Sequence, residues 1–189
     1  MSTMARLSLA EYDRMVDAAV FSGNRRLELI HGELRDMSPI GDHHRHVVNL
    51  LMEWAADQTA ARRDRLIVQV QNPIRLPAQE SAPQPDMSWI SRESSRLSPP
   101  AGDEVFLVIE VADSTLNDDR GEKAALYAEA DIPEYWIVNL IDGWIEVHRG
   151  PQSGSYQSRS VVRAGEEVRP LLFADCVLQI SSLLERPGR

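Results

Sequence analysis

Two different spacings of apolar residues along the chain predict an α/β fold. The run VFLVIEV (105–111) is almost continuously apolar, as in a strand that is covered on both faces. Segment 42–63 instead has apolar residues three and four positions apart, which predicts one long helix. Shorter helices are predicted at 8–19 and 119–130, and strands at 25–30, 33–37, 65–77, 86–90, 134–140, 144–149, 155–163 and 166–173.

Capping and turn residues predict where these elements begin and end. Ser8, with Glu11 three positions later, has the pattern of a capping box, and Asp42 is a plausible N-cap of the long helix. His31-Gly32 and Asp142-Gly143 each join two apolar runs, which predicts β-hairpins. A bend is expected at Pro73 in the strand at 65–77, and polar loops at 77–86 and 91–104.

The chain has no linker long enough to separate two domains, so residues 1–189 are expected to form a single domain. A mixed sheet with a long helix and a shorter helix against it is the economical arrangement. No apolar run approaches the ~18 residues that span a bilayer, and residues 1–15 lack the apolar region of a secretory signal. The single cysteine, Cys176, cannot form an internal disulfide, which favours a reducing cytoplasm.

The formal net charge of −9 argues against a broadly basic surface that would grip a phosphate backbone. Local basic patches are still compatible with this charge, because Arg25 and Arg26 are adjacent and ARRDR (61–65) holds three arginines. A surplus of carboxylates also suits a divalent-metal site, since hard cations bind clustered oxygens.

Glu110 is unusual because every neighbour in its predicted strand is apolar. An unpaired carboxylate would be costly to bury there. It therefore either lies at an exposed strand end, the commoner case for a lone Glu, or is neutralised by a cation, a basic side chain or water. Asp86 follows Pro85, where a loop is expected to enter the sheet.

The helix after Glu110 supplies a basic side chain. Asp119, Lys123 and Tyr127 are four positions apart and share one helical face. Lys123 could form a surface ion pair with Asp119, worth only ~0.3–0.5 kcal/mol. Alternatively, it could reach back over the strand end to Glu110 and stabilise developing negative charge.

Other candidate residues have weaker local support. His43, His44 and His46 open the long helix, where imidazoles can bind a metal but are more often surface groups. Glu28 alternates with apolar neighbours and Glu33 directly follows the turn glycine, so the local pattern favours solvent exposure for both.

An ordered series of motifs gives the chain a family resemblance. The order PD, a spacer of about two dozen residues, and an acidic residue in an apolar strand resembles the PD-(D/E)xK nuclease superfamily. The chain is most similar to its Uma-type branch of endonucleases, from Leu27 to Phe173. The stretches that carry the similarity are RLELIHGEL, HRHV, QPDMSWI and VIEVADSTLNDDRGEKAALYAEADIPEYWIV.

The resemblance implies a restriction-endonuclease-like core with flanking helices and extra C-terminal strands. It implies that Asp86 and Glu110 bind Mg²⁺ or Mn²⁺, which would activate water for phosphodiester hydrolysis. The position of the motif lysine, two after Glu110, holds Ala112, and the matching lysine is Lys123 on the following helix. The same resemblance adds Glu33 as a further catalytic residue and gives supporting roles to His44, Glu28 and Tyr127.

Three functions follow from these expectations. The first is a metal-dependent endonuclease that acts on DNA. The second is a catalytically silent nucleic-acid-binding or regulatory module of the same fold, which the net charge of −9 favours. The third is a structural protein that associates through exposed strand edges, and a homodimer is also compatible with the endonuclease.

Overall fold

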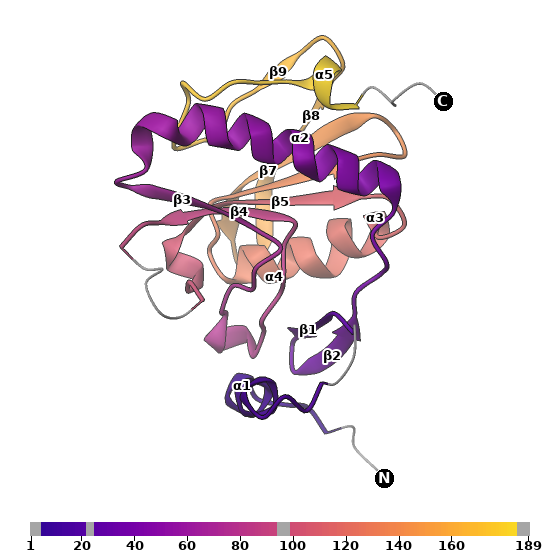
Figure 1. Cartoon of the computed structure of the whole chain (residues 1–189), viewed down its shortest axis with the longest axis vertical. Coiled ribbons are helices and arrows are strands. Elements are labelled where there is room, and N and C mark those ends of the chain that lie inside the picture. The colour runs from indigo at the N-terminus through magenta and orange to yellow at the C-terminus, as the bar shows by residue number, and fades with distance from the viewer. Residues whose placement is uncertain (1–4, 22–24, 94–98, 185–189) are drawn as a thin grey trace.

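The computed structural model describes residues 5–21, 25–93 and 99–184, so part of the loop expected at 91–104 lies outside the described residues. A six-stranded mixed sheet runs through the centre of the molecule (Figure 1). Its spatial order follows the chain: β3 (Leu66–Val70), β4 (Met87–Ser91), β5 (Val105–Ala112), β6 (Glu134–Asn139), β7 (Trp144–Gln152) and β8 (Ser155–Arg163).

Strands β5 and β6 are the parallel pair in this sheet, and the other neighbours are antiparallel. A parallel pair needs a crossover connection. Here the crossover is one continuous helical segment made of α3 (Leu116–Asp118), a π-helical turn η4 (Asp119–Lys123) and α4 (Ala124–Glu129). The helix predicted at 119–130 is therefore confirmed, but it begins earlier and contains a π turn.

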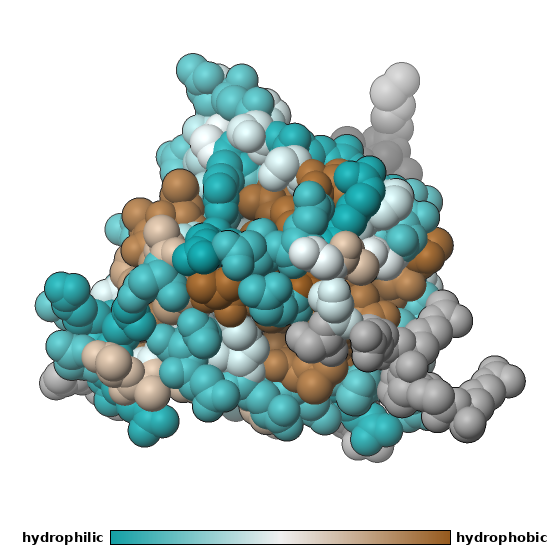
Figure 2. Space-filling view, turned by 90° about the horizontal axis from the view of Figure 1, so that it is seen from above, coloured by the Kyte–Doolittle hydropathy of each residue, from teal (hydrophilic) through white to brown (hydrophobic). Residues whose placement is uncertain are grey.

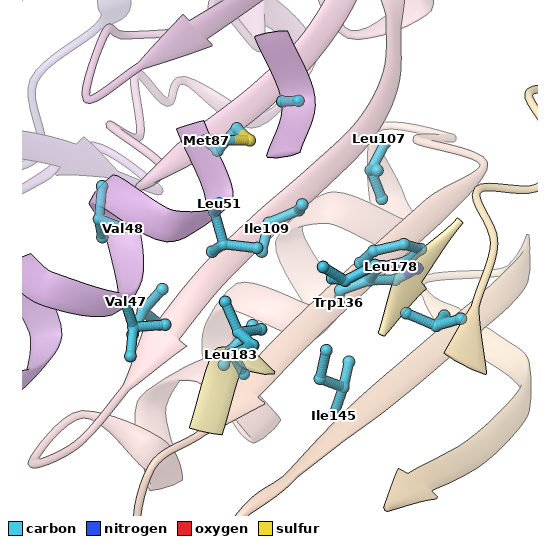
Figure 3. Packing of buried hydrophobic residues seen from close by; sticks show 14 of the residues in the cluster. Val47, Val48, Leu51, Met87, Leu107, Ile109, Trp136, Ile145, Leu178 and Leu183 are labelled. Atoms are coloured by element: carbon cyan, nitrogen blue, oxygen red, sulfur yellow. The ribbon is translucent and has the colours of Figure 1, made fainter. Parts of the chain in front are cut away.

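The two faces of the sheet are covered by different helices (Figure 1). The long helix α2 (Asp42–Thr59) lies over one face, and α4 lies over the other. Val47 and Leu51 of α2 point toward Ile109 of β5 and Trp136 of β6 (Figure 3). On the same side lie the C-terminal elements β9 (Glu167–Val168), β10 (Leu178–Gln179) and α5 (Ile180–Leu184).

The N-terminal part of the chain lies on the α4 side of the sheet (Figure 1). It comprises α1 (Leu9–Asp17) and the hairpin of β1 (Leu27–Ile30) and β2 (Glu33–Asp36). The predicted capping box is present, because Ser8 and Glu11 exchange hydrogen bonds. The hairpin turns at Gly32, whose φ of +77° favours glycine, and a Cβ there would lie 2.8 Å from the carbonyl oxygen of Leu7.

Several predicted boundaries were wrong. Gly41, and not Asp42, is the N-cap of α2. The strand predicted at 65–77 ends at Val70, because Gln71 has a φ of +52° and turns the chain. The strand predicted at 166–173 is reduced to β9. Short 3₁₀ turns are present at Ala60–Arg62, Pro77–Gln79 and Gly102–Glu104.

The surface on the side of α2, β9 and α5 is largely hydrophilic, and its apolar patches are separated by polar side chains (Figure 2). Within the described ranges, the helices are too short or too polar to cross a membrane. Cys176 is buried and forms no disulfide, and a buried thiol of this kind packs as a small apolar residue.

Candidate active site

The alternation of side chains along β5 explains its one carboxylate. Leu107 and Ile109 face α2, whereas Val108 and Ala112 belong to the core on the α4 side. Glu110 shares their parity and faces α4, where it is only 3% exposed. The reading of Glu110 as an exposed strand end is therefore wrong, and its charge must be balanced inside the protein.

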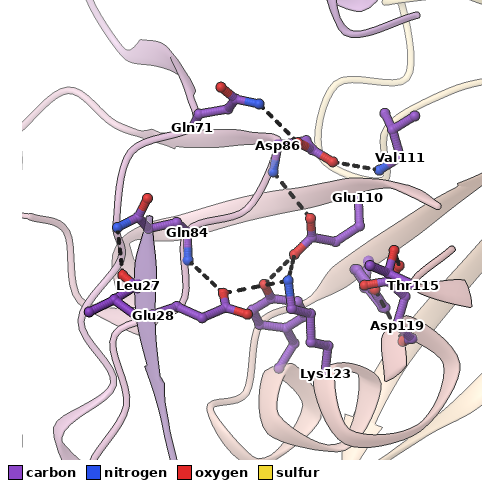
Figure 4. Close-up of polar contacts among 12 residues, drawn as sticks. Leu27, Glu28, Gln71, Gln84, Asp86, Glu110, Val111, Thr115, Asp119 and Lys123 are labelled. Carbon is purple, nitrogen blue, oxygen red and sulfur yellow. Dashed lines mark hydrogen bonds and ion pairs between the residues drawn. The ribbon is translucent and has the colours of Figure 1, made fainter. Parts of the chain in front are cut away.

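Asp86 meets Glu110 because β4 and β5 pair with Met87 opposite Ile109. The backbone N–H of Asp86 donates to Oε2 of Glu110 at 3.2 Å. The N–H of Val111 donates to Oδ2 of Asp86 at 2.9 Å (Figure 4). Main-chain hydrogen bonds thus fix both carboxylates at the same end of two neighbouring strands.

Lys123 reaches the strand end from the π turn. Its Nζ lies 3.0 Å from Oε1 of Glu110 and 3.5 Å from Oε2 of Glu28. The hydroxyl of Tyr127 donates to the same Oε1 of Glu110 at 2.8 Å. Of the two alternatives for Lys123, contact with Glu110 is confirmed.

The alternative of a surface ion pair fails because Asp119 is not a surface residue. It is 2% exposed, and its Oδ2 accepts a hydrogen bond of 2.7 Å from the hydroxyl of Thr115. π-helical turns are rare and often lie at functional sites. In this one, Asp119 and Lys123 line the site cavity, while Arg120 forms an ion pair with the fully buried Glu146 of β7.

His44 is the histidine that joins the site. Its Nε2 lies 2.9 Å from Oδ2 of Asp86, and Gln71 donates to Oδ1 of the same carboxylate at 3.3 Å. Burial acts to raise the pKa of Asp86, but the His44 contact, the Val111 N–H and the Gln71 amide together lower it below its ordinary value. Asp86 is thus held as a carboxylate.

Glu110 and Asp119 are in the opposite situation. Burial raises the pKa of Glu110 to about 8, with Asp86, Asp119 and Glu28 adding to the effect and Lys123 opposing it. Burial also raises the pKa of Asp119 to about 6. Burial alone would lower the pKa of Lys123, but the surrounding carboxylates hold it above its ordinary value. The cluster carries more carboxylates than one ammonium group can balance.

Glu28 is a full member of this cluster. It is 7% exposed, and its Oε2 accepts a hydrogen bond of 3.3 Å from the backbone N–H of Gln84 (Figure 4). The expectation from strand alternation that Glu28 faces solvent was wrong, because the hairpin packs this face of β1 toward Lys123.

Comparisons with known proteins decide the family. The model of the Uma2 family, described as "Putative restriction endonuclease", matches residues 9–181. This chain belongs to the Uma2 family. The Uma-type resemblance of its sequence motifs is therefore confirmed.

A solved structure shares the fold of this Uma2 family member. The crystal structure, described as a putative nuclease belonging to DUF820 from Anabaena variabilis, superposes with a TM-score of 0.73. The identity is 14%, and the match covers 94% of this chain and 97% of that chain. It confirms the predicted mixed α/β fold. A search of the curated proteins finds no match.

The candidate active site of this Uma2 family member opens into a cavity of about 430 Å³. Asp86, Glu110, Lys123, His44 and Glu28 all line it. Tyr127 lies beneath, fully buried against Glu110.

Glu33 is the predicted catalytic residue that the structure does not bring to this cavity. Its carboxylate pairs instead with Arg6 at 3.2 Å and Arg35 at 2.7 Å. Its catalytic role stays a prediction from family resemblance.

The chemistry of the donor set suits a divalent cation. Mg²⁺ keeps several waters and takes one or two carboxylates, and Asp86 and Glu110 offer two at one strand end. In the part of the chain that the structure describes, no three or more His, Cys, Asp or Glu side chains are grouped so that they could hold a metal. The residues therefore fit a largely hydrated Mg²⁺ or Mn²⁺ better than a metal enclosed by protein ligands.

Some members of the site were missed in the sequence. Gln71 and Gln84 carry no motif that separates them from other loop glutamines. Lys123 did carry a clear signal, because it is the only lysine in a chain whose other 19 basic residues are arginines. A compact ammonium at that point is therefore not a consequence of the chain's general usage of basic residues.

Proposed function

We propose that this Uma2 family member is a metal-dependent endonuclease that hydrolyses DNA phosphodiester bonds. The observation that carries the proposal is the excess of buried carboxylate where β4 begins and β5 ends: Glu28, Glu110 and Asp119 surround Lys123, and Asp86 lies beside Glu110. Such an arrangement is costly unless a cation joins it. Carboxyl groups with strongly shifted pKa values in a cavity are also characteristic of catalytic sites.

In this proposal Asp86 and Glu110 hold Mg²⁺ or Mn²⁺. The bound ion would activate water and offset charge on the phosphate oxygens. His44 and the N–H of Val111 orient Asp86, which limits the reorganisation needed on binding. Tyr127 does the same for Glu110.

Lys123 has two roles in the proposal. Its ammonium group contacts the side-chain oxygen of Glu110 in the free protein. It also lies in the cavity wall, where it can stabilise negative charge that develops on the phosphate. Glu33 would act as a further catalytic group if substrate binding released it from its arginine partners.

The acidity of the cavity favours a second candidate, a nucleic-acid-binding or regulatory module without turnover. A net charge of −9 opposes tight binding to a phosphate backbone. Cytoplasmic location and a homodimer belong to the first proposal as expectations. A dimer would bring two sites to one duplex and allow both strands to be cut in one encounter.

Cleavage assays test the proposal. Purified protein is incubated with single-stranded and duplex DNA in Mg²⁺, Mn²⁺ or EDTA. We expect cleavage only with metal, and a loss of at least about 100-fold in Asp86→Asn and Glu110→Gln, because each removes a metal ligand.

Glu53→Gln is the matched control, since Glu53 is exposed on α2 and outside the cavity. Equal cleavage by wild type and all three variants would reject the assignment. DNA binding without cleavage in any metal would favour the silent module.

A further inference from the structure

The walls of the site cavity are strongly acidic. Among the described residues that line it, eight are Asp or Glu and three are Lys or Arg. A phosphodiester that enters such a cavity is repelled unless positive charge meets it. Since the proposed metal would balance part of this charge at Asp86 and Glu110, the basic side chains decide where else a phosphate can bind.

Two of the three basic residues are already engaged by the protein. Lys123 contacts Glu110 and Glu28. Arg35 forms ion pairs with Glu33 at 2.7 Å and Glu122 at 3.1 Å. Neighbouring carboxylates therefore already balance most of both positive charges in the free protein.

Arg26 is different. Its side chain forms no hydrogen bond or ion pair with any residue that the structure describes, although it lies in an acidic cavity wall. Its main chain is fixed, because its carbonyl accepts a hydrogen bond of 2.9 Å from the N–H of Met37 across the hairpin. The backbone therefore holds Arg26 in place, while no described residue engages its guanidinium.

Arg26, one residue before β1, continues the alternation of this strand and lies in the cavity wall. Arg26, Glu28 and Ile30 are two positions apart, and all three line the cavity. Arg25 has the opposite parity, does not line the cavity, and forms a two-pronged ion pair with Asp36. Two adjacent arginines thus have different surroundings: Arg25 is paired with Asp36 on the surface, whereas Arg26 lines the cavity and has no side-chain partner among the described residues.

We infer that Arg26 binds a phosphate group of the nucleic acid, next to the phosphate at the carboxylate cluster. This inference rests on the proposed function, because it assumes that the cavity receives a phosphodiester. A guanidinium presents a planar fork of donors that matches two phosphate oxygens, so an unpaired arginine suits this role better than a lysine. Arg26 would be a substrate-binding residue, and the proposed chemistry would stay with the cluster.

The test compares Arg26→Gln with Arg25→Gln, which make the same change of charge in neighbouring positions. Binding of a short fluorescent DNA is measured by anisotropy in Ca²⁺, which binds oxygen ligands, at several salt concentrations. We expect Arg26→Gln to raise the Kd about 5- to 10-fold. We also expect it to reduce the slope of log Kd against log salt by about 1, as for one lost phosphate contact. Arg25→Gln should change the Kd less than 2-fold by the same reasoning, since its charge is already balanced by Asp36.

Each outcome decides the inference. Equal effects of the two variants would overturn it, because they would reflect net charge alone. No effect of Arg26→Gln, or no binding of DNA by the wild type, would also overturn it. If the Arg26-specific loss is seen but the wild type never cleaves DNA, the inference stands and the endonuclease proposal fails. Circular dichroism of both variants shows whether the hairpin substitutions leave the fold intact.

Discussion

Replacing Glu110 with glutamine should stabilise the metal-free protein at neutral to alkaline pH, although it removes a proposed metal ligand. Burial, with the nearby carboxylates, raises the pKa of Glu110 from 4.5 to about 8. The folded protein therefore retains a proton that the unfolded chain releases. The contribution of Glu110 to stability is fully present below pH 4.5 and is lost as the pH rises toward 8.

The structure sets the magnitude of this effect. A shift of three to four pKa units at about 1.4 kcal/mol each gives an upper bound of about 5 kcal/mol. Glutamine keeps an oxygen for Tyr127 and Lys123, but its amide nitrogen cannot accept from the N–H of Asp86. That lost hydrogen bond costs about 1 kcal/mol. We therefore expect Glu110→Gln to exceed the wild type by about 1–3 kcal/mol near pH 8.

Urea unfolding followed by the fluorescence of the four tryptophans measures this difference. In EDTA, the free energy of unfolding of the wild type should fall relative to Glu110→Gln between about pH 5 and about pH 8. Adding Mg²⁺ should stabilise the wild type by mass action and leave Glu110→Gln unchanged. Parallel pH profiles, or a Glu110→Gln protein that is less stable at pH 8, would refute the reasoning.

Two further substitutions test the surroundings of the cluster. Lys123→Arg keeps the positive charge but should lower the rate of cleavage by about 100-fold. The larger, planar guanidinium cannot take the place of a compact ammonium group between Glu110 and Glu28. A cleavage rate within a few-fold of wild type would contradict this prediction. Glu146→Gln should destabilise the fold by about 2–4 kcal/mol at pH 7 in urea unfolding, because it leaves the guanidinium of Arg120 without its buried partner. Burial acts to raise the pKa of Glu146, but hydrogen bonds from Arg120 and other neighbours lower it to about 2. The contribution of Glu146 to stability should therefore be present above pH 4.5 and be lost as the pH falls through 2. A stability difference between the two proteins that stays unchanged down to about pH 2 would count against this reasoning.

Much of the fold could be predicted from the sequence, because the capping and turn residues agreed with the spacing of apolar residues. The capping box at Ser8, the hairpin through Gly32 and the buried strand at 105–111 all form where the sequence predicts them. The boundaries that failed depend on backbone conformation. The chain leaves the strand at Gln71, which has a left-handed backbone conformation. Glutamine is not one of the residue types that predict such a turn.

The sequence by itself determined the chemical types of the site and their order: an aspartate entering the sheet, a glutamate in an apolar strand, and one lysine on the next helix. It could not decide which carboxylates are buried, because Glu28, Glu33 and Asp119 all have patterns compatible with solvent. Only the tertiary structure turned Glu28 toward Lys123, left Glu33 with arginines, and buried Asp119 through a π turn. The physical reason is that burial and charge balance arise between segments distant in sequence, whereas periodicity reports only the neighbours along one segment.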